Sequence, residues 1–123
     1  MMILAIEAFA ALVTFDAIAL MGFGRVHKLM GRCPRLKMRH TAGTVDQVCA
    51  AVDEACIWYF RRVMCLQRSA VTMWLLRLHG IDASLVIGFR PVPLDSHAWV
   101  EVDGTVVNDR PQYQKFFRVL ERL

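Results

Sequence analysis

Residues 65–80 read CLQRSAVTMWLLRLHG, an apolar run that opens with a cysteine and closes with a glycine. Its apolar side chains cover most of a helical circumference, and they are Leu66, Ala70, Met73, Trp74, Leu75 and Leu78. A helix that is apolar nearly all round is buried, and Gly80 is suited to end it as a left-handed cap. We therefore predict a central helix over residues 65–79 that carries Cys65 in its first turn.

The chain before this run is predicted to be helical in two places. Residues 1–30 form an apolar helical region, and a second helix follows a basic loop and spans residues 44–60. Thr44 and Gln47 make a capping-box arrangement at its start. It packs through an apolar stripe at helical spacing, formed by Val45, Val48, Val52, Cys56 and Tyr59.

After residue 83 the hydrophobic period changes to that of strands. We predict antiparallel strands within residues 83–109, over residues 85–89, 97–102 and 106–109. A short closing helix is predicted to follow over residues 112–122. Helices first and an antiparallel sheet afterwards indicate the α+β class. The length of 123 residues fits one domain, so we expect a single domain over residues 1–123, with helices in 44–80.

The amino-acid composition narrows the kinds of partner that the chain can bind. At 56% hydrophobic and 21% charged residues the chain is apolar for its size, so part of its surface is expected to meet a partner or a membrane face. Glu7 and Asp16 interrupt the first apolar run and no signal peptide is evident. A core or interfacial helix is therefore favoured over a transmembrane span, and membrane contact is not expected. Basic residues gather in 25–39, as a solvated loop or a docking patch for an acidic protein or peptide. No aromatic residues interleave with them, which argues against nucleic acid.

The four cysteines match neither a zinc-ligand pattern nor a secreted disulfide framework. We therefore expect a reducing compartment, a cytoplasmic location, and no bound metal or cofactor. Cys33, Cys49 and Cys56 are interpreted as structural residues. Cys65 is different because a helix N-terminus lowers the pKa of a thiol and favours the nucleophilic thiolate.

Cys65, His97 and Asp109 are the candidate catalytic residues. Cys65 as thiolate would attack a carbonyl carbon, His97 would accept the thiol proton and later protonate the leaving amine, and Asp109 would fix the imidazole tautomer. Taken singly, each has an ordinary structural interpretation, as a buried cysteine, a strand histidine and a turn aspartate. Their joint arrangement favours the catalytic one.

Whether His97 and Asp109 meet depends on the hairpin between their strands. A two-residue loop at Asp103 and Gly104 would set His97 opposite Arg110. A three-residue loop that includes Val102 would set His97 opposite Asp109, with Gly104 at positive φ. The triad hypothesis predicts the three-residue loop.

The neighbouring polar residues are given other roles. The backbone N–H of Cys65 is the expected oxyanion donor, and a second donor, such as Gln67 or Trp58, is left open. His79 is interpreted as a helix C-terminal cap. Glu101 is expected to be a substrate-side or surface charge, and Asp95 a weak substitute acid.

These segments resemble the transglutaminase-like leader peptidases of lasso-peptide biosynthesis. The resemblance covers about residues 60–110 and rests on phrases in the family's order and spacing: Cys65-Leu66-Gln67-Arg68-Ser69, Leu75-Leu76-Arg77-Leu78-His79-Gly80-Ile81, His97-Ala98-Trp99-Val100-Glu101-Val102-Asp103-Gly104 and Val107-Asn108-Asp109.

The resemblance implies a papain/transglutaminase-like fold and a thiol protease with a triad of Cys65, His97 and Asp109. Such enzymes remove the leader from a ribosomally made lasso precursor peptide, so that a separate ATP-dependent cyclase can close the macrolactam. It also implies a separate leader-recognition protein, because a chain this short has no room for that domain, and leaves contact with the cyclase open.

Three rival functions stay open. An acyltransferase of the same fold would use the same thiol and histidine. A non-catalytic binding module would keep the fold without activity, and a membrane-anchored interaction protein would use residues 1–23. Loss of function in Cys65→Ala would separate the enzymes from the binding module.

Overall fold

The computed structural model describes residues 2–20, 22, 28, 42–60, 62–91 and 94–123. Within these residues three helices come first, namely α1 (Met2–Leu20), α3 (Ala42–Trp58) and α4 (Cys65–Leu78). A four-stranded antiparallel sheet follows in the order β3-β2-β1-β4, built from β1 (Ala83–Pro91), β2 (Leu94–Val102), β3 (Thr105–Val106) and β4 (Arg118–Arg122), with a short α5 (Tyr113–Phe116) before β4. The predicted α+β class is confirmed.

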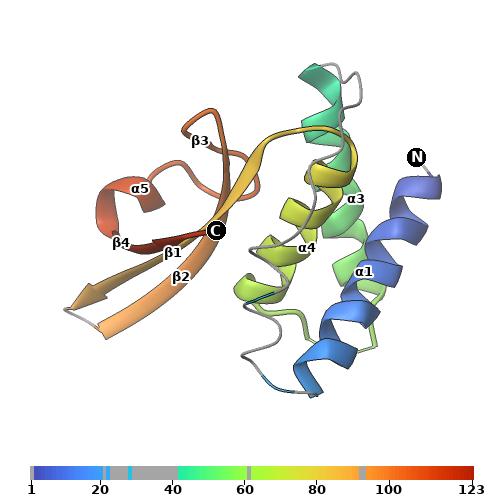
Figure 1. The fold of residues 1–123 in the computed structure, drawn as a ribbon, viewed down its shortest axis with the longest axis horizontal. Helices are drawn as coiled ribbons and strands as arrows, with labels where there is room; N and C mark the ends of the chain where they lie inside the picture. The colour runs from blue at the N-terminus through green and yellow to red at the C-terminus, as the bar shows by residue number, and fades with distance from the viewer. Residues whose placement is uncertain (1, 21, 23–27, 29–41, 61, 92–93) are drawn as a thin grey trace.

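Helix α4 lies at the centre of the molecule, as its apolar sequence predicts. It contacts α1 and α3 on one side and β1 and β2 on the other (Figure 1). The main core joins its buried residues to inward-facing strand residues such as Leu85, Ala98 and Val100. Gly80 has φ +82° just beyond the helix, which confirms the predicted left-handed cap.

The sheet has a second, smaller core on its other face. Because successive strand residues point to opposite faces, Val86 and Trp99 lie away from α4. They pack with Val106, Phe117 and Tyr113. Figure 1 shows α5 on this side, away from the three long helices. The sheet is therefore covered on both faces.

Helix α3 begins at Ala42 and ends at Trp58, so it lies two residues earlier than the predicted range of 44–60. Thr44 is then inside the first turn, and the predicted capping box is wrong. The helix is placed by tertiary packing, since Val48 and Val52 are fully buried against the core. The predicted stripe is thus correct although the predicted cap is not.

The closing helix predicted over residues 112–122 is wrong. Only Tyr113–Phe116 is helical, and Arg118–Arg122 forms β4, which pairs with β1 from Phe89↔Arg118 to Val86↔Arg122. The reason is tertiary: the outer edge of β1 has N–H and C=O groups that need partners, and an added strand supplies them.

Helix α1 is long and apolar enough to cross a bilayer by length and composition, with a mean hydropathy of 2.1 over Ile3–Leu20. Both of its carboxylates nevertheless have protein partners. Glu7 Oε2 lies 3.1 Å from Nε2 of His79, and Asp16 accepts a hydrogen bond from the Tyr59 hydroxyl. The rest of the predicted region 1–30 lies largely outside the described residues, as does the basic loop.

An apolar groove of about 400 Å³ runs between α1 and α3. Its lining is formed by Ala5, Ile6, Phe9, Ala10, Glu54, Ala55 and Trp58. Several other apolar side chains of the same two helices are exposed, among them Ile3, Val13 and Ile57. Part of the apolar content of the chain is therefore exposed on the surface formed by α1 and α3.

Candidate active site

Cys65 is the first residue of α4, where a helix N-terminus was predicted. Met64 before it is extended, with φ −86° and ψ 166°, and makes no side-chain cap. The thiol is partly buried and free. Unpaired N–H groups at a helix start carry partial positive charge, which suits a developing oxyanion beside the thiol.

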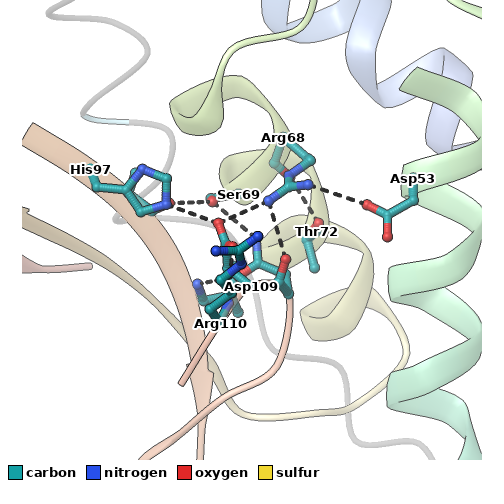
Figure 2. A network of polar contacts seen from close by, with 10 residues as sticks. Asp53, Arg68, Ser69, Thr72, His97, Asp109 and Arg110 are labelled. Carbon is teal, nitrogen blue, oxygen red and sulfur yellow. Dashed lines mark hydrogen bonds and ion pairs between the residues drawn. The ribbon is translucent and has the colours of Figure 1, made fainter. Parts of the chain in front are cut away.

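His97 and Asp109 form a direct pair. Nε2 of His97 lies 2.8 Å from Oδ2 of Asp109, and the two side chains are 19% and 15% exposed. A carboxylate can only accept, so Nε2 carries the proton in this bond and Nδ1 is the ring nitrogen left to act as a base. Figure 2 shows His97, Asp109 and Arg68 pointing toward one another from β2, the bend after β3, and α4.

The hairpin that brings this pair together differs from the predicted one. The register is Glu101↔Val106 and Val102↔Thr105, which is a two-residue loop. Asp103 and Gly104 have φ of +52° and +77°, as a type I′ turn requires. The predicted positive φ of Gly104 is confirmed, but the three-residue loop is wrong. Aspartate tolerates the left-handed region well enough to share the turn with glycine.

Asp109 reaches His97 because the third strand stops early. A strand was predicted over residues 106–109, but β3 spans only Thr105–Val106. The backbone then bends at Asn108 and Asp109. Val107 N–H still donates to Val100 O at 3.0 Å, but Val100 N–H donates to Oδ1 of Asn108 at 2.8 Å. The Asn108 side chain thus replaces a backbone acceptor, and the chain leaves the ladder.

Ser69 ties this bend to α4 and to β2. Asn108 Nδ2 donates to Ser69 Oγ at 3.0 Å, and Ser69 Oγ donates to the carbonyl of Ala98, also at 3.0 Å. Ser69 lies one helical turn after Cys65, on the same face of α4, and Ala98 follows His97. The start of α4 and the His97 end of β2 are therefore neighbours. Within the described residues, no hydrogen bond joins Cys65 directly to His97.

Arg68 completes the polar network and was not singled out from the sequence. Its Nη2 donates to Asp109 Oδ2 at 3.0 Å and to the Asn108 carbonyl at 3.2 Å. Its Nη1 lies 3.6 Å from Oδ1 of Asp53 on α3. The available signal was spacing: three residues after Cys65 is one helical turn, which puts both side chains on one face.

A family model described as the transglutaminase-like superfamily matches residues 10–122. The chain belongs to this superfamily. The predicted transglutaminase-like fold class is confirmed with it. The chain is also similar to the microcin J25-processing protein McjB of Escherichia coli, with 42% identity over 59 residues, which is 48% of this chain and 28% of that protein. The match therefore spans less than a third of that relative. No solved structure matches.

His97 of this transglutaminase-like chain is packed among aromatic rings. Its ring centroid lies 4.2 Å from that of Tyr113, 5.9 Å from Phe117 and 6.3 Å from Trp99. The contact with Tyr113 in particular covers one face of the imidazole. These rings restrict the rotation of His97 about its side-chain bonds and so help to define where Nδ1 points.

Glu101 is not the substrate-side or surface charge that the sequence suggested. It is 5% exposed, accepts from Trp99 Nε1 at 2.8 Å and lies 2.6 Å from Arg122 Nη1. Burial alone would raise its pKa, but hydrogen bonds from Trp99, Gln114 and Arg122 outweigh burial and hold the pKa below its ordinary value. The Glu101 carboxylate therefore connects Arg122 of β4 with Trp99 on the aromatic face of the transglutaminase-like sheet.

The two side chains considered as second oxyanion donors have other surroundings. Gln67 is buried, and its Nε2 donates to the Leu12 carbonyl of α1 at 3.1 Å. Trp58 is exposed and lines the groove between α1 and α3. Asp95, the substitute acid, is exposed and lies 3.7 Å from Arg90, while its Oδ1 accepts from the Ser96 N–H.

The remaining cysteines behave as the sequence predicts where they are described. Burial, followed by the nearby Asp53 and Asp46 carboxylates, raises the pKa of the Cys49 thiol to about 11. Burial also raises the pKa of Cys56. Both thiols are poor nucleophiles at neutral pH, and Cys33 lies outside the described residues. His79 occupies the C-cap position of α4, as predicted. The described residues contain no cluster of three or more metal-ligating side chains.

Proposed function

We propose that this chain is a thiol protease that removes the leader from a ribosomally made lasso precursor peptide, with Cys65, His97 and Asp109 as its catalytic residues. The observation that carries the proposal is the bond between His97 Nε2 and Asp109 Oδ2, beside the start of α4. It leaves Nδ1 as the only ring nitrogen free to serve the thiol of Cys65. Superfamily membership and the similarity to a microcin-processing protein support the same reaction.

In the first half-reaction, His97 Nδ1 takes the proton of the Cys65 thiol, and the thiolate attacks the scissile carbonyl carbon. The carbonyl oxygen becomes an oxyanion that accepts from the Cys65 backbone N–H. The C–N bond then breaks, the imidazolium gives its proton to the leaving amine, and the leader stays on Cys65 as a thioester. The core peptide departs with a free amino terminus.

In the second half-reaction, His97 Nδ1 takes a proton from water, and the hydroxide oxygen attacks the thioester carbonyl. The C–S bond breaks, Cys65 recovers its proton from the imidazolium, and the leader is released with a carboxylate. Asp109 keeps the ring in one tautomer throughout. The free amine of the core is the group that a separate cyclase would join to a side-chain carboxyl.

The proposal includes a separate leader-recognition protein, which would present the precursor, and leaves contact with the cyclase open. It also includes a cytoplasmic location and a single catalytic domain over residues 1–123. The exposed apolar side chains of the helical half support association with a protein partner.

The test is mass spectrometry of a lasso-type precursor incubated with this chain and a leader-binding partner. Wild type is compared with Cys65→Ala, and Cys56→Ala serves as the matched control because its thiol lies in α3. Cleavage at one leader–core junction by wild type and Cys56→Ala alone supports the proposal. An intact precursor with a competent partner, or equal cleavage by Cys65→Ala, would contradict it. An added primary amine that ends up on the leader carbonyl would instead identify an acyltransferase.

A further inference from the structure

Arg68 binds the same carboxylate oxygen that faces His97. Its Nη2 lies 3.0 Å from Asp109 Oδ2, and His97 Nε2 lies 2.8 Å from that atom. Building on the proposed function, we propose that Arg68 is a positioning residue that fixes the Asp109 carboxylate, so that His97 holds Nδ1 ready for Cys65. Arg68 itself touches no reacting atom.

The guanidinium holds the side chain and the backbone of the bend at the same time. Nη2 reaches both Asp109 Oδ2 and the Asn108 carbonyl, which lies 3.2 Å away. Oδ1 of Asp109 accepts from the Arg110 N–H at 2.9 Å, so both carboxylate oxygens are occupied. A carboxylate bonded at both oxygens has little freedom to rotate, and the planar fork of arginine suits such multiple bonding.

Arg68 also connects the catalytic helix to α3. Its Nη1 lies 3.6 Å from Asp53 Oδ1, on the side of the guanidinium away from Asp109 (Figure 2). Arg68 is 29% exposed and Asp109 15%, so the Arg68–Asp109 ion pair is only partly screened by water. The Arg68 guanidinium is thus held by Asp53 of α3 on one side and by Asp109 of the bend after β3 on the other.

The charges of the cluster also suit the reaction. Asp53 and Asp109 supply two carboxylates and Arg68 one cation, which leaves one net negative charge when His97 is neutral. That charge is balanced when His97 holds the proton taken from Cys65. Without Arg68 the cluster would carry a second uncompensated charge, and the Asp109 carboxylate would be free to turn away from the ring.

The test compares Arg68→Met and Arg68→Lys with wild type, and uses Arg118→Met, an exposed β4 arginine, as the matched control. We expect kcat for leader cleavage to fall roughly 100-fold in Arg68→Met with KM nearly unchanged, because misplacing a catalytic group by about 1 Å costs this much. Arg68→Lys should recover part of the loss, since lysine restores the charge but not the fork. Arg118→Met should match wild type.

A second readout does not need the precursor. The rate at which iodoacetamide alkylates Cys65 reports the thiol–imidazole pair, and it should fall about tenfold in Arg68→Met, toward the rate of His97→Ala. If wild type left the precursor intact, the proposed function would fail, yet this rate would still decide the role of Arg68.

A folded Arg68→Met with wild-type kcat, or with a loss confined to KM, would overturn the proposal. If Arg68→Met does not fold, Arg68→Lys decides the matter by alkylation. A Cys65 rate between those of wild type and His97→Ala supports positioning, and a wild-type rate contradicts it.

Discussion

His97 Nε2 lies 2.8 Å from Asp109 Oδ2, although the register of their hairpin would set His97 opposite Arg110 if the ladder continued. The pair exists because the backbone leaves the ladder at Asn108. The amide side chain of Asn108 therefore ends the ladder of an ordinary two-residue hairpin. This allows Asp109 to meet His97 beside the start of α4.

Asn108 should consequently matter more than its position outside the proposed triad suggests. Asn108→Leu keeps the size of the side chain but removes the acceptor for the Val100 N–H and the donor to Ser69. We expect a loss of about 1–3 kcal/mol in the free energy of unfolding and a large loss of peptidase activity. Urea denaturation and the cleavage assay measure the two effects. Asn108→Asp retains the acceptor oxygen and should lose less stability, and the reverse order would contradict this account of the bend.

Glu101 predicts how stability depends on pH. Because its folded pKa lies below the ordinary value of 4.5, its contribution is fully present above that value and is lost as the pH falls through the folded pKa. Glu101→Gln removes this contribution. The difference in unfolding free energy between wild type and Glu101→Gln should thus be largest near neutral pH and shrink below about pH 4.5. Urea unfolding at several pH values tests this, and a difference that grows in acid would refute it.

Gly88 should not tolerate a side chain. A Cβ there would lie 2.7 Å from Cη2 of Trp99 and 2.9 Å from Cβ of Phe117. We expect Gly88→Ala to lower the free energy of unfolding by about 1–3 kcal/mol, because overpacking displaces the rings behind His97. Gly104→Ala is the comparison: nothing lies within 4 Å of its Cβ, and only its φ of +77° opposes substitution. Thermal melts should show both losses, but only Gly88→Ala should also change the near-ultraviolet circular dichroism of Trp99.

The raised thiol pKa values of Cys49 and Cys56 predict selective alkylation. A thiol whose pKa is about 11, as for Cys49, is almost entirely protonated at pH 7 and reacts slowly. Brief treatment with iodoacetamide at pH 7 should leave Cys49 and Cys56 unmodified in peptide maps, and modification of Cys49 should begin only as the pH rises toward 11. Rapid labelling of either thiol at neutral pH would contradict the burial described here.

Much of the fold was predictable because the deciding signals are local. The apolar circumference of residues 65–79 predicts α4, and Gly80 marks its end. The strand β4 could not be recognised in the same way. Its sequence, RVLER, has no clear helical or strand period, and it becomes a strand only because β1 presents an edge that needs backbone partners.

The candidate site was predictable in its residue types but not in its geometry. His97 and Asp109 were paired from the sequence through a register that is wrong, because no local pattern shows that the Asn108 side chain accepts from Val100. Arg68 was missed although its spacing from Cys65 places both on one helix face. A search for charged residues one turn from the expected nucleophile would have found it.

The catalytic role of Cys65 is tested most directly by an acid-quenched single turnover of a lasso-type precursor in the presence of a leader-binding partner, followed by peptide mapping of this chain. The proposed mechanism predicts a transient leader thioester on the peptide that contains Cys65, slower to form in Asp109→Ala and absent in Cys65→Ala. Cleavage of the precursor without any adduct on Cys65, or with the adduct on another residue, would contradict it.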